Sequence, residues 1–195
     1  MFEAFKISNP LSDLCYVKKG LDTGLNKTFL RYWFEINFNK IGFNFPSSDL
    51  TKYSNFKWFP YNKGGRYRKW YGNQEYVIDW ENDGKKLRHF KKSNIRNLPF
   101  QFKRSITWTL LSSSNFGVRF SPQGFLFDSN GSSLFTENIE TYYYVGAFLC
   151  SKICFDFLKI INSSMAYNIG DIKKLPLLYL EQYNNKIGIY LLLII

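Results

Sequence analysis

Cationic and aromatic side chains are concentrated in the middle of the chain. Residues 52–104 hold 14 Lys or Arg and four Asp or Glu, a net charge of +10, whereas the other 142 residues hold 12 bases and 11 acids. The same window holds 13 of the 39 aromatic residues. Lys and Arg neutralise phosphates, and aromatic rings stack on bases. This pattern favours a polyanionic partner, with nucleic acid first and an acidic protein or a membrane surface as alternatives. Overuse of Lys, Asn, Tyr and Phe by a low-GC genome is a plainer explanation of part of the excess.

Residue types for acid–base, metal or phosphate-loop chemistry are scarce. His89 is the only histidine, and its place in the cationic run 88–92 is typical of a solvated or phosphate-facing side chain rather than a general base. The sequence has no G-x-G and no G-K-[ST] pattern, the loops that cradle phosphates and dinucleotides. Asp79, Glu81 and Asp83 alternate, and we expect them on one side of a strand, paired with nearby cations rather than holding a divalent metal. The chain therefore looks like a binding protein.

The cysteines and the N-terminus indicate a reducing compartment. Cys15, Cys150 and Cys154 are an odd number without metal-site spacing, so we expect core thiols in a cytoplasmic protein. Glu3 and Lys6 interrupt the start of the chain where a signal peptide would be apolar. No stretch reaches the ~20 apolar residues of a membrane span. The sequence predicts no membrane partner.

The positions of Gly, Pro, Asn and Ser predict a single α+β unit, a mostly antiparallel twisted sheet with one long C-terminal helix. Apolar spacing predicts a helix over 27–36 and a long one over 137–161, capped by Thr136 or Asn138. We expect turns at 82–84 and 168–171 and a loop at 46–49. Strands are expected at 76–78, 106–111, 116–120, 124–127 and 132–135, the last four as an antiparallel meander, with an extended stretch at 175–178.

The order and spacing of several segments resemble a known family. Residues 20–35, 61–73 with 80–84, and 106–109 through 112–119 to 131–133 resemble the C-terminal half of BREX-type (PglX-like) adenine-specific DNA methyltransferases of phage-defence systems. They are also similar, more broadly, to fused restriction-modification methyltransferases. Residues 146–152 and 168–176 look like the closing helix and strand of target-recognition domains in restriction specificity subunits. The resemblance covers residues 20–176.

This resemblance implies target recognition without catalysis. The family uses a Rossmann-like domain with a Gly-rich loop for S-adenosylmethionine and an N-P-P-[YF] motif that holds the flipped adenine. Here Asn9 and Pro10 are followed by Leu11 and Ser12, and no glycine loop precedes them. We therefore expect no cofactor in this chain and no activity on its own. The chain would be a fragment, a remnant or one subunit of a split enzyme. The expected organisation is an N-terminal segment (1–50), a target-recognition domain (51–186) and an apolar tail (187–195), which suits either truncation or a terminal core element.

Double-stranded DNA is the partner that the resemblance implies, with a catalytic methyltransferase subunit or another defence protein as a second one. The alternative is a protein-interaction module that docks onto a separate catalytic subunit. Gly64 and Gly65 would let the backbone approach DNA closely. Arg66, Arg68 and Arg119 are candidates for reading guanine, and Trp70 and Tyr71 for stacking or for the core. The candidate DNA-binding residues are Lys63, Arg66, Arg68, Lys69, Trp70, Tyr71, Arg88, Lys91, Lys92, Arg96, Arg104 and Arg119.

Overall fold

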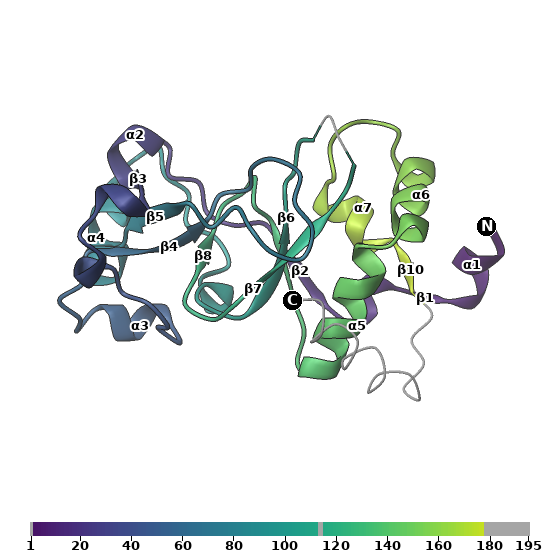
Figure 1. Cartoon of the computed structure of the whole chain (residues 1–195), viewed down its shortest axis with the longest axis horizontal. Helices are drawn as coiled ribbons and strands as arrows, with labels where there is room; N and C mark the ends of the chain where they lie inside the picture. The colour runs from purple at the N-terminus through teal and green to yellow at the C-terminus, as the bar shows by residue number, and fades with distance from the viewer. Residues whose placement is uncertain (1, 113–114, 178–195) are drawn as a thin grey trace.

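Two four-stranded sheets, one in each half of an elongated molecule, organise the chain (Figure 1). The computed structural model describes residues 2–112 and 115–177. The strand order is β2-β9-β6-β7 in one sheet, called here the β6 sheet, and β3-β5-β4-β8 in the other, called the β4 sheet. The strands are β1 (Asn9–Pro10), β2 (Tyr16–Lys18), β3 (Leu30–Tyr32), β4 (Trp58–Asn62), β5 (Tyr76–Asp79), β6 (Ser105–Trp108), β7 (Val118–Ser121), β8 (Leu126–Phe127), β9 (Ser133–Phe135) and β10 (Pro176–Leu177).

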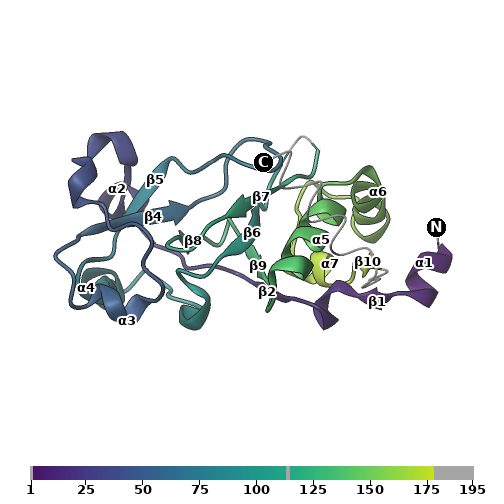
Figure 2. The same cartoon turned by 60° about the horizontal axis from the view of Figure 1, so that its bottom comes forward.

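The helices cover the two ends of the molecule. In both views α2, α3 and α4 lie around the β4 sheet, α5, α6 and α7 lie beside the β6 sheet, and α1 extends beyond them (Figures 1 and 2). The helices are α1 (Phe2–Ile7), α2 (Asn26–Phe29), α3 (Ser48–Thr51), α4 (Glu81–His89), α5 (Ile139–Leu149), α6 (Lys152–Ile161) and α7 (Ile169–Lys173), with 3₁₀ turns at Leu11–Asp13, Trp33–Glu35, Phe38–Lys40 and Leu98–Phe100. No helix in the described ranges is long and apolar enough to cross a membrane.

Each sheet has its own apolar core. Strands rich in aromatic and β-branched residues, such as Trp58–Asn62 and Tyr76–Asp79, suit a pleated surface that is buried. Phe59, Trp80 and Phe102 belong to the core of the β4 sheet. The core of the β6 sheet lies between its strands and helices α5 to α7. The expected α+β class with mainly antiparallel pairing is confirmed; only β4 and β8 pair in parallel.

The long helix expected over 137–161 is wrong, because two helices occupy this segment. Asn138 caps α5, as expected, by accepting a hydrogen bond from the Thr141 amide. The helix then ends at Leu149. Ser151 has an extended backbone, and its hydroxyl accepts a hydrogen bond from the Cys154 amide, which starts α6. A serine cap inside the apolar pattern therefore divides the segment.

The helix expected over 27–36 is also wrong. Only Asn26–Phe29 is helical, and Leu30–Tyr32 forms β3, in antiparallel register with Tyr76–Ile78. Pairing with a distant strand therefore overrides the local helical spacing. The 3₁₀ turn Trp33–Glu35 follows directly and carries exposed rings.

The expected strands after residue 105 are all present, but they do not form one meander. β6 pairs antiparallel with β7 on one side and with β9 on the other, whereas β8 joins the other sheet beside β4. The segment 168–171, expected as a turn, begins helix α7, and the loop 46–49 runs into α3. The expected turn at 82–84 lies within α4, where all three residues have positive φ. Residue 178 and the tail 187–195 lie outside the described residues.

Candidate nucleic-acid interface

The loop 63–73 joins the two sheets. It leaves the end of β4, reaches the edge of β7 in the other sheet, and returns to β5. At its far point the Trp70 amide donates to the Val118 carbonyl at 2.8 Å, and the Phe120 amide donates to the Trp70 carbonyl at 2.9 Å. The Trp70 ring stacks on Phe120 and packs against the core of the β6 sheet. Trp70 therefore anchors the loop, which is the core role considered for it above.

Thr109 holds the tip of this loop in place. Its hydroxyl accepts a hydrogen bond from the Gly65 amide at 3.1 Å and donates one to the Gly65 carbonyl at 3.0 Å. The Asn73 amide group donates to the Arg66 carbonyl at 2.8 Å. Gly65 has φ +148 and lies against the Asn73 side chain, a conformation and a contact that a Cβ would not tolerate. The backbone that carries Arg66 and Arg68 is thus fixed from both sides.

A cationic cavity opens beside the tip. It has a volume of about 340 Å³ and is lined by Lys63, Gly64, Gly65, Arg66, Arg68, Asn73, Glu75 and Tyr76. Arg66 and Arg68 are exposed, and neither forms an ion pair within the described part of the chain. Glu75 contributes the one carboxylate in this lining. Two arginines against one glutamate leave the cavity cationic, which suits an anion such as phosphate.

Lys63 connects this cavity to a second, polar one of about 230 Å³. The Lys63 ammonium pairs at 3.1 Å with Asp128, a buried carboxylate that also accepts a hydrogen bond from the Tyr61 hydroxyl at 2.6 Å. Burial and the Asp128 charge raise the pKa of Tyr61 well above its ordinary value. Lys63 is therefore engaged in the fold, and its charge is largely neutralised where it stands.

The next cations lie on the far side of the second cavity. Asp22 lines that cavity and pairs with Arg96 at 2.9 Å. Gly24 lies against the backbone of Lys92. Lys91 and Lys92 are exposed, with no ion pair among the residues that are described. Lys63, Arg66 and Arg68 thus line the first cavity, and Arg96 and Lys92 adjoin the second one through Asp22 and Gly24.

The remaining candidates are separated from these cations. Arg88 pairs with Asp83 at 2.9 Å and lies over the Trp80 ring. Lys69 donates to the Cys150 carbonyl at 2.7 Å, and Arg104 lies over the Tyr142 ring of α5. Lys69 and Arg104 are therefore placed against α5, beside the β6 sheet, and not at the cationic cavity.

Arg119 does not lie on the surface expected for a base-reading residue. It is 2% exposed and lies in β7, where its Nη1 donates to Thr109 Oγ1 at 3.3 Å. Its Nε has no hydrogen-bond partner among the residues that the structure describes. Burial lowers the pKa of Arg119 to about 10, so the side chain stays charged at neutral pH. Arg119 therefore helps to position Thr109, which holds Gly65, and adds positive charge near the tip of the loop.

An aromatic cavity, missed by the sequence analysis, lies next to the cationic one. It has a volume of about 300 Å³ and is lined by Trp33, Phe38, Phe43, Pro60, Tyr71, Gln74, Tyr76, Val77 and Phe125. Tyr76 lines both cavities, so they adjoin at this side chain. Tyr71, expected to stack or join the core, is exposed here. The sequence feature that could have predicted this cavity is the high density of aromatic residues among polar ones between residues 29 and 45.

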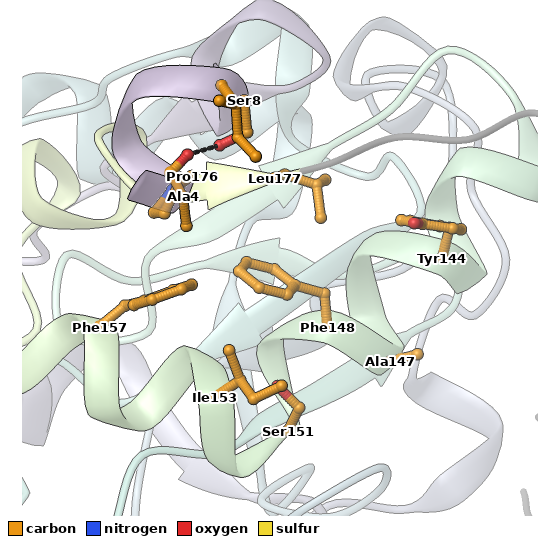
Figure 3. A pocket seen from close by; sticks show the side chains of 11 residues that line it. Ala4, Ser8, Tyr144, Ala147, Phe148, Ser151, Ile153, Phe157, Pro176 and Leu177 are labelled. Atoms are coloured by element: carbon orange, nitrogen blue, oxygen red, sulfur yellow. Dashed lines mark hydrogen bonds between the residues drawn. The ribbon is translucent and has the colours of Figure 1, made fainter. Parts of the chain in front are cut away.

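An apolar groove of about 390 Å³ lies at the other end of the molecule (Figure 3). Phe148, Ile153 and Phe157 of the α5–α6 segment face Ala4 of α1 and Leu177 of β10 across it. Ile153 and the nearby Ile7 are exposed. No charged residue of the described ranges lines this groove, which distinguishes it from the cationic cavity.

The residues expected to lack chemistry occupy structural positions. All three cysteines are free and buried, and burial raises the pKa of the Cys15 thiol to about 12. The expected core thiols are confirmed.

His89 is exposed and its Nδ1 lies 2.7 Å from the Lys85 carbonyl oxygen. Asp79 lies in β5 and pairs with Lys57 and Lys86, while Glu81 and Asp83 lie in α4 rather than on the strand. Within residues 2–112 and 115–177 no group of three His, Cys, Asp or Glu could hold a metal.

Comparison with known proteins gives two long relatives. The adenine-specific methyltransferase PglX of Lacticaseibacillus casei (strain Zhang) is 39% identical over 183 residues, which is 90% of this chain and 15% of that protein. The adenine-specific methyltransferase BrxX of Escherichia coli O9:H4 (strain HS) is 41% identical over 163 residues, 82% of this chain and 13% of that protein. This chain is a homologue of BREX-type adenine-specific methyltransferases. It spans about one seventh of the length of these methyltransferases. No protein-family model matches it.

Proposed function

We propose that this chain is the DNA-binding, target-recognition part of a BREX-type adenine-specific DNA methyltransferase, and that it acts in phage defence. The proposal rests mainly on the cationic cavity, in which two exposed arginines without carboxylate partners are held on a fixed backbone. The relatedness to adenine-specific methyltransferases supports DNA as the polyanion. Contacts to phosphates supply affinity, and bidentate hydrogen bonds from arginine to guanine recognise the base sequence.

In this function Arg66 and Arg68 contact a phosphate or a guanine edge directly. Their planar guanidinium groups match phosphate oxygens and the O6 and N7 acceptors of guanine. Lys91 and Lys92 add phosphate contacts from the neighbouring segment. Arg119 acts as a positioning residue through Thr109, because its own guanidinium is buried. Lys63, Arg88 and Arg96 contribute less to affinity, since each already pairs with a carboxylate.

Methyl transfer takes place in another part of the enzyme. S-adenosylmethionine, the donor expected for such relatives, finds no Gly-rich loop among the described residues, since the sequence has no G-x-G pattern. The motif that would hold the adenine is also missing. Asn9 and Pro10 form β1, which is paired with β10, and the chain continues into the 3₁₀ turn Leu11–Asp13 instead of a second proline and an aromatic ring. We therefore derive no catalytic step within this chain.

Titration of labelled duplex DNA with this chain tests the proposal. Fluorescence anisotropy at about 50 and 200 mM salt should show binding that weakens steeply at the higher concentration, because bound cations release counterions from the DNA. Absence of binding at the lower salt would contradict the proposal. A methyl-transfer assay with S-adenosylmethionine on the same sample should give no product above background.

The apolar groove supports a second candidate function, docking onto a separate protein such as the catalytic part of the methyltransferase. Exposed apolar surface of this kind is common at protein interfaces. This function predicts association with the catalytic part and no affinity for duplex DNA by itself. Ile153→Asp, which places a charge in the groove, should weaken protein association and leave DNA titration unchanged.

A further inference from the structure

The aromatic cavity presents rings with no partner on one side. Trp33 is 47% exposed, Phe38 61% and Tyr71 64%, which is unusual for large apolar side chains gathered in one place. The other side of this cluster is ordered. Tyr32 stacks on Phe34 with ring centroids 5.2 Å apart and on Tyr76 at 4.8 Å, and Phe38 packs against Phe43 at 4.9 Å. The rings therefore form a fixed platform rather than a set of independent side chains.

The cationic cavity begins where the platform ends. Tyr76 forms part of both linings, and its hydroxyl donates a hydrogen bond to the Tyr32 hydroxyl at 3.2 Å. That hydrogen bond and partial burial raise the pKa of Tyr76 to about 12. Arg66 and Arg68 lie on one side of this boundary, and the exposed rings lie on the other.

We propose that these two cavities together bind one unpaired nucleotide of DNA, with its base on the platform and its phosphate at Arg66 and Arg68. This inference rests on the proposed function and deepens it, because it assigns a separate site to a base that has left the helix. A base offers a π-face to aromatic rings only when it is unstacked, so paired DNA leaves the platform unused. The adjoining cations favour a nucleotide over an apolar peptide, which would leave both arginines without a counter-charge.

Gln74 gives this site a polar group that can meet the edge of the base. Its side chain lines the aromatic cavity and makes no hydrogen bond to the described residues. A carboxamide can donate to one position and accept at the neighbouring one, which matches the N7 acceptor and N6 donor of adenine and similar edges of other unpaired bases. The cavity volume of about 300 Å³ is at the lower end of small-ligand sites, as a single base requires. The lining therefore accommodates one base, with adenine among those it fits.

Matched duplexes with and without one unpaired adenine test this inference. The full chain is titrated against both labelled DNAs, and the measurement is repeated with Trp33→Ala/Phe38→Ala. Both rings are exposed, so the substitution should leave the thermal unfolding midpoint unchanged, and circular dichroism checks this. Tyr53→Ala is the control, because Tyr53 is 83% exposed and lines neither cavity.

The chain should bind the DNA with the unpaired adenine more tightly than the paired duplex. Trp33→Ala/Phe38→Ala should weaken binding of that DNA about tenfold, as expected for loss of base stacking, and leave the paired duplex unaffected. Gln74→Ala should weaken binding of the DNA with the unpaired adenine and leave the paired duplex unaffected. Equal affinity of the wild-type chain for the two DNAs, or equal losses on both in the ring variant, would overturn the inference. Paired-duplex binding would then still stand, so the two proposals fail separately.

Discussion

Among the cations of the middle segment, those with a partner in the fold serve its stability, and exposed ones without such a partner remain available for a ligand. Lys63, Arg88 and Arg96 are of the first kind, and Arg66 and Arg68 are of the second. The distinction matters for affinity, because a paired cation gains little when a phosphate replaces its carboxylate. Net charge alone, the basis of the sequence argument, counts both kinds equally.

Asp128→Asn tests the role of Lys63, one of the cations that pair with a carboxylate. The Asp128 carboxylate accepts hydrogen bonds from the Tyr61 hydroxyl and the Asn130 amide and pairs with Lys63, all in a buried setting. The substitution leaves Lys63 without its counter-charge, and we expect a loss of ~2–3 kcal/mol in the free energy of unfolding. Urea denaturation gives this value.

Asp156→Asn is the matched control, because Asp156 pairs with Lys152 at the surface and such pairs contribute ~0.5 kcal/mol. Equal losses in the two variants would show that the Asp128 cluster has no special role in stability.

At the scale of elements, local signals predicted the strands well and the helix boundaries poorly. Tyr76–Ile78 and the strand segments after residue 105 follow from β-branched and aromatic runs between turn residues. The spacing at 27–36 matched a helix, yet Leu30–Tyr32 pairs with β5, more than forty residues later in the chain. Such pairing is a tertiary effect that periodicity does not contain. The parallel pairing of β8 with β4 was missed for the same reason.

The candidate site was predictable in part. The cations and Gly64–Gly65 of the loop 63–73 were found because composition and turn residues are visible in the sequence. The burial of Arg119 was not visible, since β7 places it under Thr109, an effect of the sheet. The aromatic platform was missed because Trp33 was assigned to the expected helix over 27–36, whereas Trp33 and Phe38 lie in exposed 3₁₀ turns.

The break between α5 and α6 gives a prediction at this scale. Ser151→Ala removes the side chain that accepts from the Cys154 amide and should cost ~1 kcal/mol of stability, measured by urea denaturation. Ser151→Asp keeps an acceptor and should retain most of the wild-type value. If both variants were as stable as the wild type, the cap would not be what starts α6.

For the whole molecule, two sheets with separate cores are joined by the loop 63–73, so that loop lies where the halves meet. The hydrogen bonds of Trp70 to β7 and of Gly65 to Thr109 fix the loop at two points. The positions of Arg66 and Arg68, which lie between these points, are therefore set by the fold. A surface built in this way is rigid without being part of either core. Such placement suits a contact surface that must present charges in a fixed pattern.

Buried acidic groups predict alkaline instability of the whole fold. Burial holds the Cys15 thiol neutral and raises its pKa from 9.0 to about 12, while the unfolded chain ionises near 9.0. The unfolded state is therefore favoured progressively as pH rises from 9 towards 12, and this contribution to stability is fully present below pH 9. Urea denaturation across this range should show falling stability, with a smaller decline in Cys15→Ala. Stability that is flat over the same range would contradict this account of burial.

The salt dependence of duplex binding tests the central claim most directly. If about six phosphates are neutralised, log K should fall with log salt at a slope of about −5 in the wild-type chain. Arg66→Ala/Arg68→Ala should flatten the slope by about two, and Lys173→Ala/Lys174→Ala, which removes the same charge from exposed positions on and just after α7, should leave it unchanged. A slope equally altered in both variants, or unaltered in the arginine variant, would contradict the assignment of DNA binding to the cationic cavity.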